Sequence, residues 1–405
     1  MTPYTERYLL VAGLPYYLGE DGRVWLERLW HRDLIVHLRY LPRLRMAAPQ
    51  LMKRDEPDLV ALSDADARRL GLVPLPPMRS KLEALRGLPR ALRALWRAVG
   101  DADTVHSGIA GWPIPLGWFV NPIALLRKRK LVLVIESAFW RLTPSTPRTA
   151  GRLLRYHLTE ALGRWSTNRA HLVIATHRGY LRSLATHPRG ITAVTPANWV
   201  AEEDLLAADA AARLWQRKQA SPVRFAFFGR LIADKGVRVL LESIRRLAES
   251  DAAPRVDCRI DLIGQGELLE ECRRAAAAFP FVRVFDPVPY GEPFFSLARE
   301  YHAIIVPSLS DEQPRIIYDA YSQAVPVICS DTEGNRDEVT KGATGWLFEP
   351  GSPDALARAL LEAAAQTREL ARRGMNALER ARGSTHAQMH RQRAELLQRI
   401  ACPST

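Results

Sequence analysis

The sequence predicts an α/β protein made of two doubly wound domains in series, and three observations support this fold class. At 405 residues the chain is too long for one ordinary hydrophobic core and fits two domains of about 200 residues each. Hydrophobic residues make up 47% and charged residues 25%, as in soluble globular proteins. Short apolar runs alternate with segments of helical period, which is typical of parallel sheets covered by helices.

Each apolar run is expected to form a strand. In the first half the predicted strands are residues 7–13, 33–41, 103–107, 130–137, 171–177 and 190–196. In the second half they are residues 223–229, 257–264, 281–286, 302–307, 325–330 and 344–349.

The polar, alanine-rich segment 201–222 predicts a connecting helix and a linker between the two halves. We therefore expect an N-terminal domain at 1–200, a C-terminal domain at 223–383 and a closing helix at 384–405. Ser384 or Thr385 is expected to cap that helix, and the helix is expected to pack back on the N-terminal domain.

The charge balance favours anionic partners. The chain has 57 basic and 44 acidic residues, a net charge of +13. Residues 78–100 carry six basic side chains against Glu83, interleaved with leucines and Trp96 at helical spacing, and Gly87 and Pro89 are expected to break this helix. A second basic cluster, residues 127–130, follows the uncharged run 107–126.

That uncharged run has the length of a membrane span, but its three prolines favour a buried loop and helix leading into a strand. The basic segments are either a solvated surface or a docking site for anionic lipid. No nucleic-acid partner is expected, because no binding motif accompanies the charge. No metal site is expected either, since the cysteines show no paired spacing; they are Cys258, Cys272, Cys329 and Cys402.

Three loops that follow predicted strands of the second half are candidate ligand sites, because ligands gather at the carboxyl ends of parallel strands. In the first loop, Gly229 and Arg230 follow a strand and Lys235 opens a helix. A guanidinium and an ammonium beside a helix start suit a diphosphate, although the same pattern also occurs at ordinary helix starts. In the second loop, Gly264 and Gly266 either let the backbone approach a ligand or form a tight turn.

The third loop is "SLSDEQPRIIYDAYSQ". Pro314 is a favoured first helical residue, so the free amides of this helix would point into the loop that carries Asp311. Asp319 would lie about a turn and a half further on, within reach of a ligand across the helix start. The alternative is that Asp311 and Glu312 cap the helix and that Asp319 is solvated.

Together these segments resemble the retaining, family 4 type of glycosyltransferase with the GT-B fold. The resemblance runs over residues 223–365 and is carried by "FFGRLIADKGVRVLLESIRRL", "IDLIGQGELLEECRRA", "IIVPSLSDEQPRIIYDAYSQAVPVICSDTEGNRDEV" and "GATGWLFEPGSPDALARALLEA". It implies two Rossmann-like domains facing a central cleft. It also implies transfer of a sugar from a nucleoside diphosphate sugar to an acceptor hydroxyl, with no cofactor and no metal.

The resemblance also implies roles for single residues. Arg230 and Lys235 match the pair that binds the donor diphosphate. Asp311 and Asp319 match the two acids of the family's E-x7-E motif, the first at the transferred sugar and the second at the ribose. Both are Asp where Glu is usual, so a water must bridge or the donor must sit closer, and Glu312 is an alternative for the first role.

The remaining donor-side positions implied by the resemblance are Gly229, Gly264, Gly266, Gln313, Pro314, Arg315, Ile316 and, more loosely, Gly19. Residues 333–335 match the next loop at the cleft, and residues 285–291 match the segment that flanks the base.

The first half resembles the family more loosely. Glu136 stands where relatives often have a histidine near the reacting sugar. It is a candidate for holding an acceptor hydroxyl or for steadying positive charge on the sugar, and the alternative is a structural pair with Arg141 or another nearby basic residue. His106 ends a predicted strand that faces the cleft, where it serves the acceptor or is structural.

The expected function is therefore retaining sugar transfer in bacterial-type glycan or polysaccharide assembly, with a glycan or lipid-linked acceptor. The N-terminus lacks the pattern of a secretion signal, so the expected location is cytoplasmic, with peripheral attachment to the inner membrane face as an extension. Two alternatives stay open: a catalytically silent GT-B scaffold protein and a sugar-nucleotide epimerase.

Overall fold

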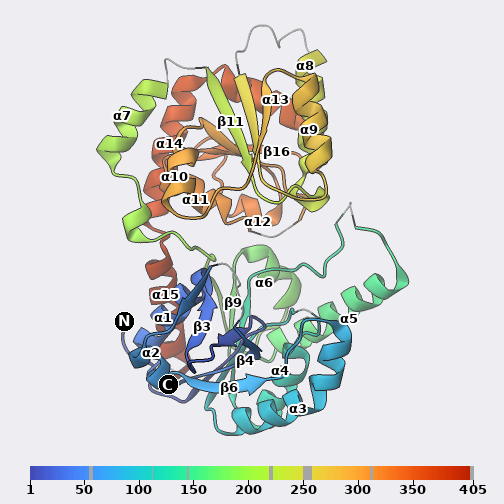
Figure 1. Ribbon diagram of the computed structural model, residues 1–405, viewed down its shortest axis with the longest axis vertical. Coiled ribbons are helices and arrows are strands. Elements are labelled where there is room, and N and C mark those ends of the chain that lie inside the picture. Colours follow the sequence, from blue (N-terminus) through green and yellow to red (C-terminus); the bar gives the residue numbers. More distant parts are fainter. Residues whose placement is uncertain are drawn as a thin grey trace. The chain divides into compact units, whose positions relative to one another are not determined.

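The structure is a computed structural model that describes residues 1–53, 58–111, 113–143, 146–218, 222–249, 258–310 and 313–401. It divides into two compact units (Figure 1). Unit 1 comprises Met1–Arg141, Thr149–Pro196 and the segment from Met389 onward, and unit 2 comprises Leu142–Arg148 and Ala197–Gln388. Both units have a mainly parallel sheet with helices against it, so the α/β prediction is confirmed.

Unit 1 contains a ten-stranded sheet in the order β10-β9-β8-β7-β1-β4-β2-β3-β5, with β6 also paired to β4. The strands are β1 Tyr8–Val11, β2 Tyr16–Leu18, β3 Val24–Glu27, β4 Leu44–Met52, β5 Leu59–Ala61, β6 Gly71–Leu75, β7 Thr104–Ser107, β8 Lys130–Ile135, β9 Leu172–Ala175 and β10 Ile191–Val194. Strand β3 runs antiparallel to β2 and β5, and the other pairs are parallel. The helices are α1 Arg28–Tyr40, α2 Asp64–Arg69, α3 Lys81–Gly100, α4 Gly117–Leu126, α5 Ala150–Thr167 and α6 Arg178–Leu184.

Two predictions for unit 1 are wrong. Residues 33–41 belong to helix α1 and its C-cap, because Leu34, Leu38 and Leu41 repeat at helical spacing and all three are buried. Pro89 lies inside the continuous helix α3 and does not end it. Five strands, β2 to β6, were not predicted at all.

Unit 2 has a six-stranded sheet, parallel throughout, in the order β13-β12-β11-β14-β15-β16. Its strands are β11 Val223–Phe228, β12 Cys258–Ile263, β13 Val282–Phe285, β14 Ala303–Val306, β15 Val327–Ser330 and β16 Gly345–Phe348. All six predicted strands are therefore confirmed. The chain first builds outward from β11 to β13 and then returns to place β14 beside β11. This reversal is the point at which open α/β sheets bind ligands.

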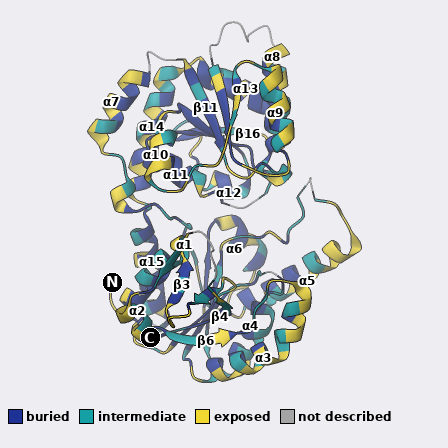
Figure 2. Ribbon diagram, viewed as in Figure 1, coloured by how far each residue is buried: buried dark blue, intermediate teal, exposed yellow. Residues whose placement is uncertain are grey.

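Helices cover the unit 2 sheet, and the strands between them are largely buried (Figure 2). The α-helices are α7 Ala208–Lys218, α8 Val237–Glu249, α9 Leu269–Ala278, α10 Glu292–Arg299, α11 Ile316–Ser322, α12 Glu333–Arg336, α13 Pro353–Ala364 and α14 Thr367–Arg382. Short 3₁₀ turns lie at η1 Glu202–Asp204 and η2 Ala233–Lys235. None of the described helices is both long enough and apolar enough to cross a bilayer.

The last helix, α15, spans His386–Ala401. Thr385 caps it, since its Oγ1 accepts a hydrogen bond from the Gln388 amide at 3.2 Å. Thr385 is one of the two residues predicted as the cap. The part of α15 that belongs to unit 1 buries Ala394, Leu397 and Ile400 in a cluster with Leu34 and Leu38 of α1. Burial of these side chains stabilises unit 1 through a segment far from it in sequence.

Candidate functional site

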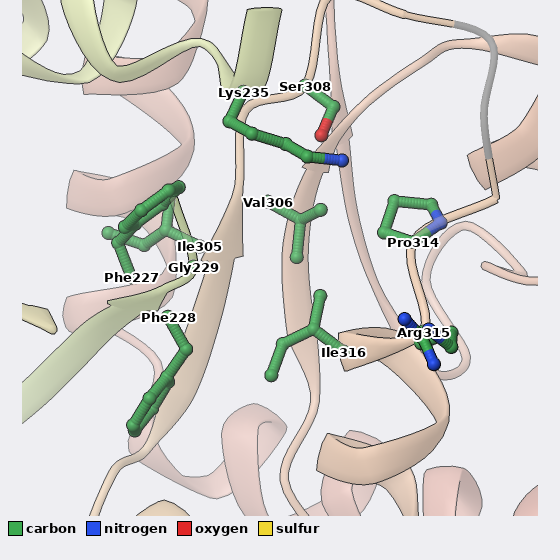
Figure 3. Close-up of a pocket in the computed structure, with 10 residues that line it drawn as sticks. All are labelled: Phe227, Phe228, Gly229, Lys235, Ile305, Val306, Ser308, Pro314, Arg315 and Ile316. Carbon is green, nitrogen blue, oxygen red and sulfur yellow. The ribbon is translucent and has the colours of Figure 1, made fainter. Parts of the chain in front are cut away.

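A pocket of about 130 Å³ lies in unit 2 where β11 and β14 end (Figure 3). Its position is the reversal point of the strand order. The lining residues are Phe227, Phe228, Gly229, Lys235, Ile305, Val306, Ser308, Pro314, Arg315 and Ile316. Five of the residues predicted to bind the donor, Gly229, Lys235, Pro314, Arg315 and Ile316, are thus brought together.

The loop after β11 supplies the cationic side of this pocket. The Lys235 side chain reaches across its upper part toward Pro314 (Figure 3). Arg230 is exposed and does not line the pocket, and its side chain makes no hydrogen bond or ion pair within the described part of the chain. Backbone geometry fixes the turn that follows: Gly236 has φ +73°, and a Cβ there would lie 1.7 Å from the Pro307 carbonyl oxygen. Only glycine fits, because both the left-handed conformation and the close approach exclude a side chain.

The two glycines of the second loop, Gly264 and Gly266, lie close to the backbone of the first loop. A Cβ at Gly264 would lie 1.9 Å from the Gly229 carbonyl oxygen, and one at Gly266 would lie 2.4 Å from that of Leu231. The Leu231 amide donates to the Gln265 carbonyl at 2.8 Å, which joins the two loops. These glycines therefore let the first two loops pack together, and their approach to a ligand stays a prediction.

The third loop reaches the pocket through Pro314, Arg315 and Ile316. Helix α11 begins at Ile316 and not at Pro314 as predicted, because the Pro314 carbonyl first accepts the Ile317 amide in a tighter turn at 3.2 Å. The amides of Arg315 and Ile316 donate no hydrogen bond within the described residues. They remain available to an anion in the pocket. Asp311 and Glu312 lie outside the described residues.

A buried polar chain supports this loop from behind. The side-chain Nε2 of Gln313 donates to Glu338 Oε1 at 3.3 Å, and Glu338 Oε2 accepts from the Arg380 guanidinium at 2.9 Å. Burial raises the pKa of Glu338, against the opposing charge of Arg380. The sequence analysis did not identify Glu338 or Arg380, since nothing local links them to residue 313.

Asp319 is buried, so the alternative of a solvated carboxylate is wrong. Its Oδ1 accepts a hydrogen bond from the Tyr290 hydroxyl at 2.9 Å. Desolvation raises the pKa of Asp319 from 3.8 to about 7, although Tyr290 and the charge of Arg315 oppose the shift. Tyr290 belongs to the segment 285–291 predicted to flank the base, so that segment and α11 meet at this pair.

The loop after β15 is tied to the loop after β14. Thr332 caps α12, and Asn335 Nδ2 donates to the Ser330 carbonyl at 2.8 Å. Ser330 in turn donates to the Ser308 carbonyl at 2.6 Å. Asn335 Oδ1 is buried and has no partner within the described residues.

Glu136 pairs with Arg393 of α15 and not with Arg141. The Arg393 guanidinium is buried and donates to Glu136 Oε1 at 3.1 Å, while the Glu136 side chain keeps 53% of its surface exposed. Arg141 instead donates to Glu160 at 2.8 Å and to Ser183 at 2.8 Å. Glu136 is thus held in place and still accessible.

His106 lies inside a buried polar cluster of unit 1. Its Nδ1 is 3.0 Å from the Tyr8 hydroxyl. Desolvation, with repulsion from His37 and Arg393, lowers the pKa of His106 to about 3. The same cluster holds His390, whose Nε2 is 3.0 Å from Asp33 Oδ1. A neutral, buried imidazole fits the structural alternative better than an acceptor-side acid or base.

Gly19 lies in the turn of the hairpin between β2 and β3. Its amide donates to the Arg23 carbonyl at 2.9 Å, and the Gly22 amide donates to the Gly19 carbonyl at 3.0 Å. Gly22 has φ +76°, which explains glycine at that position. The predicted donor contact of Gly19 stays a prediction.

The chain has recognisable relatives. Residues 222–366 match the family model for glycosyl transferases group 1. The chain is 27% identical to the D-inositol 3-phosphate glycosyltransferase of Corynebacterium glutamicum (strain R) over 164 residues. That match covers 39% of this chain and only 38% of the relative's length.

Two solved structures share the fold over nearly the whole chain. Anabaena Alr3699/HepE, solved in complex with UDP, aligns with a TM-score of 0.64 and 16% identity over 97% of this chain and 99% of its own. Sucrose-phosphate synthase from Thermosynechococcus elongatus aligns with a TM-score of 0.67 and 16% identity over 100% of both chains. These similarities confirm the GT-B prediction for the fold.

Proposed function

We propose that this protein moves a sugar from a nucleoside diphosphate sugar to an acceptor hydroxyl, because residues 222–366 match the family model for glycosyl transferases group 1. Retention of the anomeric configuration is part of the proposal and is supported by the resemblance of residues 223–365 to retaining enzymes. The acceptor is proposed to be a glycan or lipid-linked glycan in polysaccharide assembly in the cytoplasm, with unit 1 holding it near Glu136.

One observation carries this proposal: a pocket at the reversal point of the unit 2 sheet combines Lys235 with the amides of Arg315 and Ile316, which donate to no acceptor among the described residues. An ammonium and undonated amides at a helix start match the charge and geometry of a diphosphate. Arg230, an exposed residue of the same loop, is proposed to supply a second cation to the diphosphate.

The chemistry follows from where charge develops. As the bond between sugar and diphosphate breaks, negative charge grows on the leaving diphosphate, and donors already aimed at that position lower the barrier. The proposal assigns this work to Lys235, Arg230 and the α11 amides, without a metal or other cofactor. The buried pair of Tyr290 and Asp319 is proposed to bind the ribose hydroxyls, since a protonated or ionised carboxyl accepts from a hydroxyl in either state.

The first test is donor binding. Melting of the full chain is measured against a panel of nucleoside diphosphate sugars, including UDP-glucose, because a ligand of the folded state raises its stability. Lys235→Ala and Arg230→Ala are each expected to weaken the binding of the active donor about 10- to 100-fold, the usual effect of losing a charge-assisted contact. Arg283→Ala is the matched control, an exposed arginine on the edge strand β13, and should leave binding unchanged.

Turnover separates the alternatives. Radiolabelled donor with a mixed glycan acceptor fraction should give labelled glycan, and both pocket variants should lose it. Donor binding without transfer or hydrolysis would identify a silent scaffold. A changed sugar nucleotide formed without any acceptor would identify an epimerase. If no donor of the panel binds, the proposal is wrong.

A further inference from the structure

Helix α3 of unit 1 exposes large apolar side chains that an ordinary surface helix would bury. Leu82 and Leu85 are 57% and 58% exposed, and Trp96 is also exposed. The opposite face of α3 buries Ala84, Ala91, Leu95 and Ala98 in the core of unit 1. The exposed leucines therefore lie outside the face of α3 that packs against the core of unit 1.

The outward face of α3 has two edges. At about 100° per residue, Leu82, Leu85, Pro89 and Trp96 fall within roughly 60° of one another around the helix axis. Four arginines occupy the next 60° or so. They are Arg86, Arg90, Arg93 and Arg97, all of them exposed. One edge is thus apolar and the adjacent edge is basic, and both face outward (Figure 2).

The side chains of these four arginines form no ion pair or hydrogen bond within the described residues, whereas arginines on helices of unit 2 do. The only acid in α3, Glu83, turns back to accept the Arg79 amide at 2.7 Å, and its own amide donates to the Ser80 cap at 3.2 Å. In α9 and α14, arginines pair with a glutamate three residues earlier at 2.6 to 3.0 Å; these are Arg273, Arg372 and Arg382. No acid in the described part of the chain therefore balances the charge of these four arginines.

The end of α4 continues this face. Arg127 stacks over the Trp96 ring with its guanidinium carbon 4.3 Å from the centroid, and the residue before it, Leu126, is 72% exposed. The other basic residues of this cluster have different fates. Arg129 donates to the Gly100 carbonyl and Lys130 pairs with Glu6, whereas Lys128 is exposed. The cluster 127–130 is thus mostly structural, and it adds one exposed cation and one exposed leucine to the face.

We propose that this surface docks the protein on an anionic lipid bilayer. We call it the α3 surface and define it as Leu82, Leu85, Pro89, Trp96 and Leu126 with Arg86, Arg90, Arg93, Arg97 and Lys128. Its leucines and tryptophan enter the interfacial layer, and the arginines reach the lipid phosphates alongside them. Tryptophan at the boundary and arginine as the dominant cation fit this layer.

The apolar edge decides between anionic partners. A nucleic acid would neutralise the arginines but would leave Leu82, Leu85 and Leu126 in water, because its backbone offers no apolar surface. A bilayer satisfies both edges at once. The inference does not depend on the proposed transfer reaction, since lipid binding is measured without donor or acceptor.

The test is flotation of the full chain with vesicles of phosphatidylcholine alone or mixed with phosphatidylglycerol. The protein should float with the mixed vesicles and not with phosphatidylcholine alone, and high salt should weaken the binding. R86Q/R90Q/R93Q should lower the partition coefficient at least about tenfold, and L82Q/L85Q by about tenfold. Gln keeps the helix propensity, and melting curves check that each variant is folded.

Two control variants match the test variants in chemistry. R273Q/R372Q/R382Q removes three exposed arginines from unit 2, and L153Q/L154Q removes two exposed leucines from α5; neither should change binding. Equal binding of the wild type to neutral and mixed vesicles, or undiminished binding of both α3 variants, would overturn the inference. So would tighter binding to duplex DNA or to RNA than to mixed vesicles with no effect of L82Q/L85Q, which would identify a nucleic-acid surface.

Discussion

Replacing Asp319 by Asn tests the environment of the candidate donor pocket. The carboxylate is buried and accepts one hydrogen bond from Tyr290, which an Asn side-chain oxygen can also accept. The pKa of Asp319 is about 7 in the folded state, against 3.8 for an aspartate side chain in water. Between these two values the folded state binds more protons than the unfolded state, so stability falls as pH rises from about 4 to about 7.

The magnitude follows from the pKa difference. At 1.36 kcal/mol per pKa unit, the raised pKa of Asp319 lowers the free energy of unfolding, relative to its value at low pH, by about 4 kcal/mol above pH 7. At pH 5 the same pKa difference lowers it by only roughly 1.5 kcal/mol. The neutral Asn does not carry this cost. Asp319→Asn should therefore gain about 2 to 3 kcal/mol more over the wild type at pH 8 than at pH 5.

Urea unfolding of wild type and variant at the two pH values measures this difference. Asp286→Asn, at an exposed position between strand β13 and Tyr290, is the control for the loss of a carboxylate from this region. A gain of equal size at pH 5 and pH 8, or a loss at pH 8, would refute the buried, hard-to-ionise carboxylate.

Three further predictions concern other parts of the fold. Gly236→Ala should lower the free energy of unfolding by several kcal/mol, because it adds a clash to a left-handed conformation. Gly342→Ala, at φ +76° with open space around it, should lower it by only about 1 kcal/mol. Equal losses in urea unfolding would show that no clash exists at Gly236. Glu338→Ala should cost about 3 kcal/mol, since Arg380 loses its buried partner, and should also weaken donor binding in a melting assay; unchanged stability would contradict the pair. His106→Gln should reduce the loss of stability on acidification from about pH 6.5 toward pH 3, because the buried imidazole has a pKa of about 3 and resists protonation that the unfolded chain accepts; an unaltered acid transition would argue against that burial.

The strands of unit 2 could be predicted because each is a short, mostly apolar run between segments of helical period, and all but the edge strand β13 are largely buried. The same rule failed for residues 33–41, where β-branched residues suggested a strand although the buried leucines follow a helical period. The strands β2 to β6 were missed because most of them mix buried and exposed positions and contain Pro, Gly or charged residues that obscure the alternation.

In the candidate site too, only some of the arrangement could be predicted from the sequence. Gly229, Lys235 and Pro314 could be placed together because ligands bind where parallel strands end, a rule that needs only the order of elements. The partner of Glu136 could not be predicted, because Arg393 lies 257 positions away and only the packing of α15 brings the two together. Likewise, the sequence did not show that Gly264 and Gly266 lie against the backbone of the first loop, because that contact depends on how two loops pack together.

A crystal structure of the full chain with bound UDP tests the central claim most directly. The account predicts the diphosphate in the pocket at the ends of β11 and β14, within hydrogen-bond distance of Lys235 Nζ and of the amides of Arg315 and Ile316. UDP bound elsewhere, with Lys235 and these amides remote from its phosphates, would contradict the account.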